Sequence, residues 1–452
     1  MTTNDPREII DQSPMTTAQV VVVILTVLMN AMDGYDVASI AFASPGIAQE
    51  WGTTQTALGI VLSMELIGMA FGSFLLGGVA DRIGRRKTLL GCLTVMAIGM
   101  IGATTAASPL QLSLWRVFTG LGIGGVLSAT NAVVAEFSNN RWRKLCISMM
   151  VIGYPLGGTI GGQFVQGMLK TQGWRSVFYL GAGATAVLIP LVFLLVPESL
   201  HWLTRKQPAN ALARVNVALR KLGHQTVAAL PVLTEGDRNK TVTDIFSPAL
   251  VSVTLLVTAA YFFHMTTFYF ILKWTPKIVT GFQFPPSAAA GVLKWANLGG
   301  ALGGAVFGLL TARIGLKPLS IAILLLTFVG VALFGRTPAD LTTMAYLAGL
   351  AGFFGNAGVS GLYSLAAYVF PTHVRATGTG FVIGIGRGGA VLSPILAGML
   401  LDSSLPLPTI GLIMATGSLC GAIVLMFLNF EGQQEAAQRL PTPTPTLSRA
   451  RA

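Results

Sequence analysis

Gly77–Lys87 reads G-G-V-A-D-R-I-G-R-R-K, and 231 residues later Gly308–Lys317 reads G-L-L-T-A-R-I-G-L-K. A glycine, an arginine, an isoleucine, a second glycine and a base recur at the same spacing, while Asp81 is replaced by Ala312. Each segment follows the second long apolar run of its own half of the chain. The spacing therefore predicts an internal duplication, in which two similar halves make up one chain.

The composition is that of a membrane protein. Of the 452 residues, 53% are hydrophobic and only 10% are charged, and the mean hydropathy is +0.69. Soluble domains carry about 25% charged residues. We therefore predict an all-α membrane protein with twelve transmembrane helices in two six-helix halves. The apolar segments are 19–44, 55–80, 88–107, 111–137, 145–169, 175–196, 247–272, 286–311, 318–335, 341–370, 376–400 and 408–429.

The polar stretches between these segments define the predicted domains. Residues 1–18 form an N-terminal segment, 19–196 and 247–430 form the two helical bundles, and 197–246 connects the bundles. The tail, 431–452, contains alternating proline and threonine, which is typical of disorder.

Charge predicts the orientation in the membrane. Most of the 29 lysine and arginine residues fall in the termini, the central connection and the loops on the same side. The positive-inside rule places that side in the cytoplasm, so we expect a multi-pass protein of the inner (plasma) membrane with both termini cytoplasmic. The net charge of +12 then reflects topology rather than nucleic-acid binding. The bases expected on the opposite side are Lys170, Arg175, Lys273, Lys277 and Arg336.

Two carboxylates interrupt the first apolar segment, within the run N-A-M-D-G-Y-D at 30–36. Acidic side chains near the middle of a membrane helix are costly and normally face a protein interior or a water-filled cavity. Asp33 and Asp36 are three residues apart and so share one helical face. Gly34 opens that face to a neighbouring helix or a ligand. We expect Asp33, which is nearer the midplane and has no second base in its own half at that depth, to carry protons.

Arg116 and Arg387 lie inside predicted spans, where an unpaired charge is expensive. Asp36 is at a similar depth to Arg116. Two interpretations stay open: a static pair between helices, or a switchable pair whose aspartate is protonated during transport. The spans of the second half contain no acid. We therefore expect Arg387, flanked by Gly386 and Gly388, to bind a substrate carboxylate through its planar guanidinium.

Several other side chains in the spans are candidates for supporting roles. Glu65 is a second protonatable site, and Glu136 is expected to cap the end of its helix. Lys294 is expected to neutralise an acid of the other half. For His264 there are two interpretations, a proton relay or a hydrogen-bonded structural histidine. Aromatic side chains of the seventh span are expected to wall a site for an aromatic ring: Tyr261, Phe268, Tyr269 and Phe270.

The segment Gly77–Lys87, in the loop after the second of twelve spans, resembles the signature loop of the major facilitator superfamily. Arg116–Gly120 in span four and Pro197–Ser199 after span six agree with this resemblance. The D-G-Y-D run at 33–36 and the glycine-rich stretch Gly384–Gly389 are similar to the aromatic acid/proton symporter family, whose members import benzoate-like carboxylates. The duplication itself predicts substrate binding between the halves, and we expect Arg116 and Tyr35 to be among the contacts.

The signature loop has two interpretations. It is either a solvated charge run that fixes topology, or a latch in which Asp81 bonds a helix N-terminus or Arg143 and holds the cytoplasmic side closed. The repeat favours the latch. The residues expected to form it are Gly77, Asp81, Arg82, Gly84, Arg85, Arg86 and Arg143, together with Glu136.

The sequence thus predicts a monomeric, proton-coupled symporter that imports an aromatic carboxylate of the benzoate or hydroxybenzoate class, and not an enzyme. We expect no cofactor and no metal, because no ligand spacing or phosphate-binding loop is present and both G-x-G-x-x-G strings lie inside spans. A drug or organic-ion antiporter of the same fold is one alternative, although it would not need Arg387. A membrane receptor or enzyme is the other, although no extramembrane domain or catalytic cluster is evident.

Overall fold

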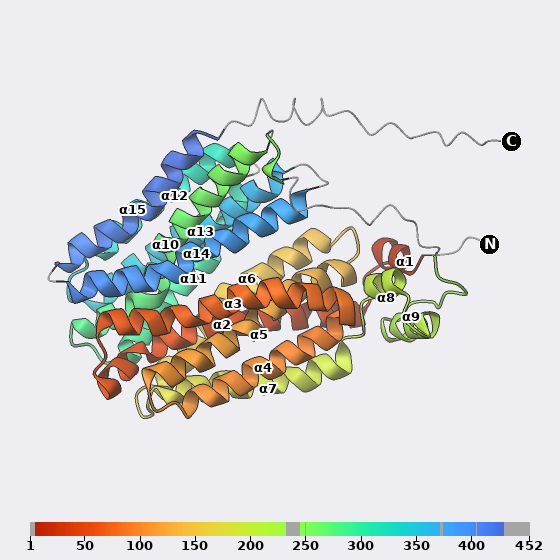
Figure 1. Cartoon of the computed structure of the whole chain (residues 1–452), viewed down its shortest axis with the longest axis horizontal. Helices are drawn as coiled ribbons and strands as arrows, with labels where there is room; N and C mark the ends of the chain where they lie inside the picture. Colours follow the sequence, from red (N-terminus) through yellow and green to blue (C-terminus); the bar gives the residue numbers. More distant parts are fainter. Residues whose placement is uncertain are drawn as a thin grey trace.

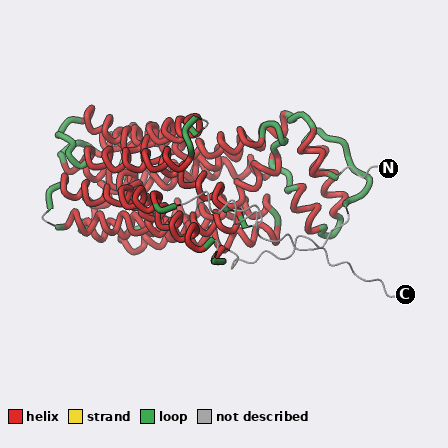
Figure 2. Tube along the Cα trace, turned by 90° about the horizontal axis from the view of Figure 1, so that it is seen from above, coloured by secondary structure: helices red, strands yellow, loops and turns green. Residues whose placement is uncertain are grey.

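The computed structural model describes residues 5–231, 245–248, 250–311, 313–370, 374–403 and 405–428. The predicted tail at 431–452 lies outside these residues. The described chain forms fifteen α-helices joined by loops, with no strand (Figure 2). Of these helices, ten are long and apolar enough to cross a membrane. The predicted all-α membrane architecture is therefore confirmed.

Twelve of the described helices contain 19 residues or more and follow the twelve predicted segments. They are α2 (Thr17–Trp51), α3 (Gln55–Ile83), α4 (Arg85–Thr104), α5 (Pro109–Phe137), α6 (Arg143–Met168) and α7 (Arg175–Leu195) in the first half, and α10 (Val251–Gly281), α11 (Pro286–Leu310), α12 (Leu316–Phe334), α13 (Leu341–Val369), α14 (Arg375–Asp402) and α15 (Leu407–Met426) in the second.

The duplication predicted from the signature loop appears in the packing of the helices. In the first half α3 packs on α5, α2 on α6, and α4 on both α5 and α7. In the second half α11 packs on α13, α10 on α14, and α12 on both α13 and α15. The same pairs thus recur with each helix number raised by eight, as two copies of one bundle require. Figure 1 shows the two bundles as separate groups of long helices.

Glycines let the helices within each half approach closely. A Cβ on Gly120 of α5 would lie 2.2 Å from the main-chain oxygen of Glu65 in α3, and one on Gly303 of α11 would lie 1.9 Å from that of Phe353 in α13. In α14, a Cβ on Gly389 would lie 2.0 Å from the oxygen of Phe262 in α10. The glycine-rich strings inside the spans therefore serve close helix packing, as expected for membrane bundles.

The two halves are joined along α3 and α14, α6 and α11, and α2 and α10. The described residues form hydrogen bonds between the halves over one part of the molecule. This part begins at the level of Ser73 and Arg387 and extends to the end where Asp402 caps the N-terminus of α3. Towards the other end the bundles diverge (Figure 1). The halves are thus held together at one end only.

The diverging end carries three short helices: α1 (Pro6–Gln12), α8 (Leu200–Lys206) and α9 (Ala211–Lys221). We call it the α8–α9 end. The predicted polar connection at 197–246 is therefore partly helical, which long apolar runs could not reveal. These helices attach to the first half, where Thr16 donates to the main-chain oxygen of Leu222 at 2.7 Å.

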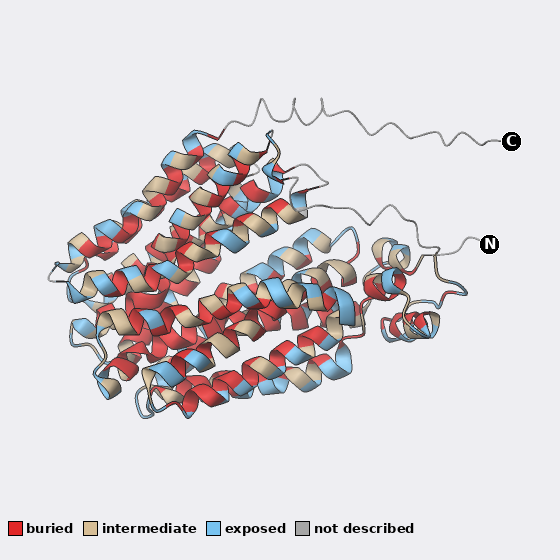
Figure 3. Ribbon diagram, in the orientation of Figure 1, coloured by how far each residue is buried: buried red, intermediate tan, exposed pale blue. Residues whose placement is uncertain are grey.

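The outer surfaces of the long helices carry large apolar side chains. Leu110 is 70% exposed, Phe164 60% and Val187 61%, and Figure 3 shows exposed residues on the outside of bundles whose interiors are buried. Isolated in water, such surfaces would be unfavourable. In a bilayer they face hydrocarbon, while the helices satisfy their own backbone hydrogen bonds.

Gly34 explains why a glycine separates Asp33 from Tyr35. A Cβ at this position would lie 1.8 Å from the main-chain oxygen of Tyr154 in α6, whereas one on Gly183 in α7 would meet nothing within 4 Å. Overpacking typically costs about 1–3 kcal/mol. We expect Gly34→Ala to lower the melting temperature of the detergent-solubilised protein, and Gly183→Ala to leave it unchanged or raise it. Equal melting temperatures for the two variants would contradict the close approach of α2 and α6.

Candidate functional site

Asp33 and Asp36 lie midway along α2 and are buried, with 1% and 0% of their surfaces exposed. Neither carboxylate has a hydrogen-bond partner among the described residues. Asp33 lies within electrostatic range of Asp36, Glu65 and Arg387. Because an ionised carboxylate buried without donors is expensive, both side chains are suited to binding and releasing a proton.

Glu65 of α3 and Arg116 of α5 form an ion pair inside the first half. Glu65 Oε2 lies 2.6 Å from Arg116 Nη2, and both side chains are fully buried. Arg116 also donates to the main-chain oxygen of Asp36 at 2.9 Å, but not to its carboxylate. The predicted pair between Arg116 and the Asp36 side chain was therefore wrong. The close approach of α3 and α5 brings Glu65, rather than Asp36, to the guanidinium.

Lys273 joins this cluster from the other half. It was expected beyond the end of the seventh span at 272, and that expectation was wrong, since α10 continues to Gly281 and the Lys273 side chain is fully buried. Its Nζ donates to the main-chain oxygen of Val37 at 2.5 Å and lies 3.5 Å from Glu65 Oε2. Hydropathy falls at Lys273 and recovers at Ile278, and that recovery was the signal that the span continues.

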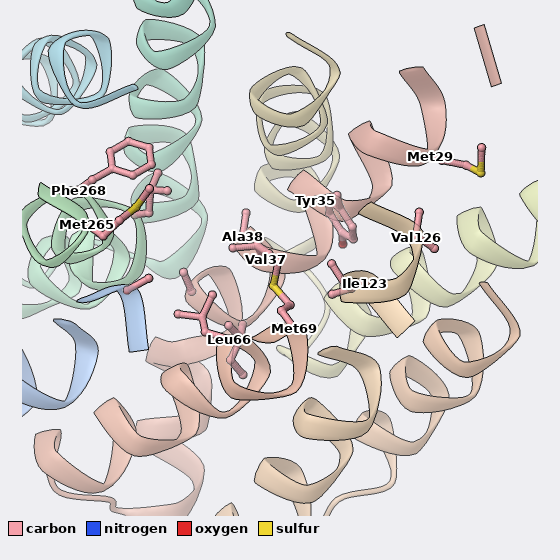
Figure 4. Packing of buried hydrophobic residues seen from close by; sticks show 14 of the residues in the cluster. Met29, Tyr35, Val37, Ala38, Leu66, Met69, Ile123, Val126, Met265 and Phe268 are labelled. Atoms are coloured by element: carbon pink, nitrogen blue, oxygen red, sulfur yellow. The ribbon is translucent and has the colours of Figure 1, made fainter. Parts of the chain in front are cut away.

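Apolar side chains surround the charges. In Figure 4, Val37 and Ala38 of α2 lie between Phe268 on the side of α10 and Ile123 on the side of α5. Tyr35 points towards the first half, where its hydroxyl donates to the main-chain oxygen of Val177 at 2.6 Å. The structure thus places Tyr35 away from the boundary between the halves.

Arg387 lies in α14 and is half-buried. Among the described residues its hydrogen-bond partner is Ser73 Oγ of α3, at 3.2 Å, and no carboxylate is within ion-pair distance. Four tyrosines contributed by both halves lie within electrostatic range of the guanidinium: Tyr154, Tyr261, Tyr269 and Tyr363. The arrangement offers a cation with unused donors in a region that contains several tyrosines, which suits an aromatic anion.

His264 occupies a structural position. Its Nε2 lies 2.8 Å from the main-chain oxygen of Gly355, so it carries the proton, and Nδ1 lies 2.9 Å from Ser418 Oγ. Both ring nitrogens are thereby engaged, and the ring stacks on Phe268 at 6.3 Å between centroids. This geometry favours the structural interpretation over a proton relay.

Lys294 contacts the other half, as expected, but not through an acid. Its Nζ donates to Gln163 Oε1 at 2.7 Å and to Gln166 Oε1 at 3.3 Å, both in α6. The expectation that Lys294 neutralises an acid was therefore wrong. It serves instead in a polar contact that joins α11 to α6 near the end opposite α8 and α9.

The signature loop forms a network within the first half. Asp81 pairs with Arg85 at 2.8 Å, Arg85 Nε lies 3.6 Å from Glu136, and Glu136 accepts a hydrogen bond from Ser199 at 2.5 Å. The predicted contact between Asp81 and Arg143 is absent, because Arg143 binds Asp11 of α1.

Four other positions of the signature segment are also placed. Gly84 has a φ of +109°, and a Cβ there would lie 2.4 Å from a carboxylate oxygen of Glu198, so only glycine fits without strain. The main-chain N–H of Arg86 donates to Glu198 at 3.1 Å. Arg82 is exposed, and a Cβ on Gly77 would lie 3.8 Å from the side chain of Ser128, an ordinary van der Waals distance.

Comparison with known proteins agrees with this architecture. Residues 26–296 and 295–451 match the Major Facilitator Superfamily. A gallate transporter of Pseudomonas putida is 28% identical over 93% of this chain and 94% of its own, and a 4-hydroxybenzoate transporter of the same species is 30% identical over 86% and 87%. The crystal structure of a D-xylose-proton symporter matches with a TM-score of 0.72 at 18% identity, covering 91% of this chain and 97% of that one.

Neutralising Glu65, which is paired with Arg116, and neutralising Asp36, whose carboxylate has no hydrogen-bond partner among the described residues, should change the stability of the protein in opposite directions. Removing one partner of a buried ion pair typically costs about 3–5 kcal/mol, because the other charge stays buried. We expect Glu65→Gln to lower the melting temperature markedly, and the matched change Asp36→Asn to maintain or raise it. Differential scanning fluorimetry of both variants would measure their melting temperatures. A larger decrease for Asp36→Asn than for Glu65→Gln would indicate that Arg116 pairs with Asp36 instead.

Proposed function

Because this chain belongs to the Major Facilitator Superfamily, we propose that it is a symporter that imports an aromatic carboxylate, of the benzoate or hydroxybenzoate class, together with protons. The observation that carries this proposal is the pairing of two features in the central region of the molecule. One is a cation with unused donors among tyrosines, and the other is a pair of buried carboxylates with no fixed partner. The names of the relatives, which include gallate and 4-hydroxybenzoate transporters, support the substrate class.

Arg387 is the proposed partner of the substrate carboxylate. A guanidinium can form two parallel hydrogen bonds with a carboxylate, and the contact with Ser73 uses only Nη1. Tyr261 and Tyr269 of α10 lie within electrostatic range of it. Aromatic rings pack favourably against other aromatic rings at about 4.5–7 Å between centroids. Packing against these tyrosines would therefore stabilise a bound benzoate ring.

Asp33 is the proposed proton carrier, with Asp36 as a second site. A carrier must be free of a permanent cation, and both carboxylates meet that condition, whereas Glu65 is held by Arg116. Asp33 also lies within electrostatic range of the Arg387 guanidinium. A substrate carboxylate at Arg387 would reduce the positive potential at Asp33 and so favour a proton there. This is the proposed link between substrate and proton.

The proposed orientation places the α8–α9 end in the cytoplasm of a cell whose inner membrane holds the protein. The excess of lysine and arginine on that side supports this orientation. The arrangement in Figure 1, joined at the opposite end, is then inward-facing. In the proposed cycle the network of Asp81, Arg85 and Glu136 keeps the end of α3 in place while the halves rock. We propose a monomer as the functional unit.

Binding and transport can be tested separately. Hydroxybenzoates and gallate should raise the melting temperature of the purified protein, since a ligand of the folded state stabilises it. Counterflow of labelled 4-hydroxybenzoate in proteoliposomes should then show exchange. A protein that is stabilised by organic cations, and exchanges none of the aromatic acids, would instead be the antiporter.

Asp33→Asn tests the proton carrier. The amide cannot take up and release a proton, so accumulation of substrate under an imposed pH gradient should be lost. Counterflow should persist, because exchange does not require net proton movement. Asp340→Asn, at an exposed position outside the spans, is the control and should accumulate substrate normally. If Asp33→Asn still accumulated substrate under the pH gradient, Asp36 would be the proton carrier instead.

Arg387 variants test the carboxylate contact. A charge-assisted hydrogen bond is worth roughly 1.5–3 kcal/mol, so Arg387→Ala should weaken binding by about one to two orders of magnitude. Arg387→Lys keeps the charge but loses the planar fork and should lie in between. The amide analogue of the substrate should bind equally to all three proteins, and Arg336→Ala at an exposed site should bind like wild type. Wild-type affinity in Arg387→Ala, by calorimetry, would show that the arginine is structural.

A further inference from the structure

Lys273 is a cation of the second half whose charged group is surrounded by the first half. Both of its polar neighbours, the main-chain oxygen of Val37 and the carboxylate of Glu65, belong to the first half. No hydrogen bond from the ammonium to the second half is found among the described residues. A fully buried lysine held in this way depends on the position of the two halves relative to each other.

Two charged side chains lie within electrostatic range of the Lys273 ammonium, Glu65 of α3 and Arg116 of α5. The other charged groups of the central region are Asp33 and Asp36 of α2 and Arg387 of α14. Of these, only Glu65 is an acid within 4 Å of the ammonium among the described residues. Glu65 Oε2 thus faces two cations, Arg116 at 2.6 Å and Lys273 at 3.5 Å.

The two cations of Glu65 differ in how they respond to movement. Arg116 lies in the same half as Glu65, so rocking of the halves leaves that pair intact. Lys273 lies in the other half, so the same rocking separates it from Glu65 and from Val37. An ammonium without a partner is unfavourable in an apolar interior. Separation at this level therefore requires either water around Lys273 or a weaker attraction from Glu65.

We propose that Lys273 is a positioning residue that makes apposition of the two halves depend on the charge of Glu65, a role that rests on the proposed proton-coupled transport. With Glu65 ionised, Lys273 holds α10 against α2 and α3 and keeps the end opposite α8 and α9 closed. Without the charge of Glu65, as in Glu65→Gln, that attraction is lost and the halves separate more readily at this end. Lys273 thereby links the charge of the central site to the conformational step.

Ser63 provides a reporter of this closure that needs no substrate. It is fully buried, and its hydroxyl donates to the main-chain oxygen of Val391 across the boundary at 2.7 Å. Ser63→Cys would be placed in a protein whose Cys92, Cys146 and Cys420 are replaced by serine. Its rate of reaction with a water-soluble maleimide, added from the side opposite α8 and α9, then measures opening.

Lys273→Met should raise this rate by about ten- to a hundredfold, the equivalent of one charge-assisted contact. Lys273→Arg, which keeps the charge, should react like the parent. Lys277→Met is the matched control, one turn further along α10 and half-buried, and should also react like the parent. Glu65→Gln should raise the rate as Lys273→Met does, and the double variant should react no faster than the faster single variant.

Two results would overturn the proposal: a parental rate in Lys273→Met, or additive effects in the double variant. A transport measurement separates this failure from failure of the proposed function. If the wild type takes up no aromatic acid, the proposed function fails while the cysteine rates still test Lys273. If the wild type accumulates substrate, Lys273→Met should lose accumulation and keep counterflow, and normal accumulation would count against the coupling role.

Discussion

The buried ion pair between Glu65 and Arg116 determines how the other central charges are arranged. Two ions cannot be removed from water unless each finds a close partner, and here the two side chains satisfy each other within one half. Arg116 is thereby committed, which leaves the carboxylate of Asp36 without a cation. Glu65 keeps enough negative potential to attract Lys273 from the other half. The unpaired carboxylate of Asp36 and the contact of Lys273 with the first half both follow from this one ion pair.

The contacts within the halves differ from those between them. Within a half, glycines such as Gly68 and Gly120 bring backbones together, and these contacts cannot be exchanged without unpacking the bundle. Between the halves, comparably close approach occurs where Gly59 of α3 meets Pro394 of α14 and where Gly398 meets Gln55. Elsewhere side chains such as Lys294 bridge the boundary. Each half can therefore move as a body about its partner, as alternating access requires.

The sequence predicted the spans and the duplication because both depend on hydropathy and local spacing. It failed where the direction of a side chain mattered. Depth along the membrane placed Asp36 level with Arg116, but the rotation of each helix about its own axis decides which acid meets the guanidinium. That rotation is set by the glycine contacts between α3 and α5, which involve residues far apart in the chain. Gly68 and Gly120 were visible in the sequence, but which helices they join was not.

Two further differences concern Lys273 and the short helices. The drop in hydropathy at Lys273 looked like the end of a span, because a lone base is indistinguishable in sequence from a base at the membrane surface. Burial of that base depends on Glu65, more than two hundred residues away. The helices α8 and α9 were missed because they are short and amphipathic, and amphipathic helices of 7 and 11 residues leave no long apolar run. The function followed from motif resemblance, whereas the contacts of each site residue required the fold.

The balance of the central charges constrains the proposed mechanism. Asp33, Asp36 and Glu65 provide three negative charges when ionised, and Arg116, Lys273 and Arg387 provide three positive ones among the described residues. A bound monocarboxylate adds one negative charge in an apolar region, and one proton restores neutrality. A second proton would make the loaded carrier positive, and the membrane potential would then favour inward movement by about 2.3 kcal/mol per 100 mV. The two carboxylates without fixed partners are enough to hold both protons, so the site can serve either stoichiometry without breaking the Glu65–Arg116 pair.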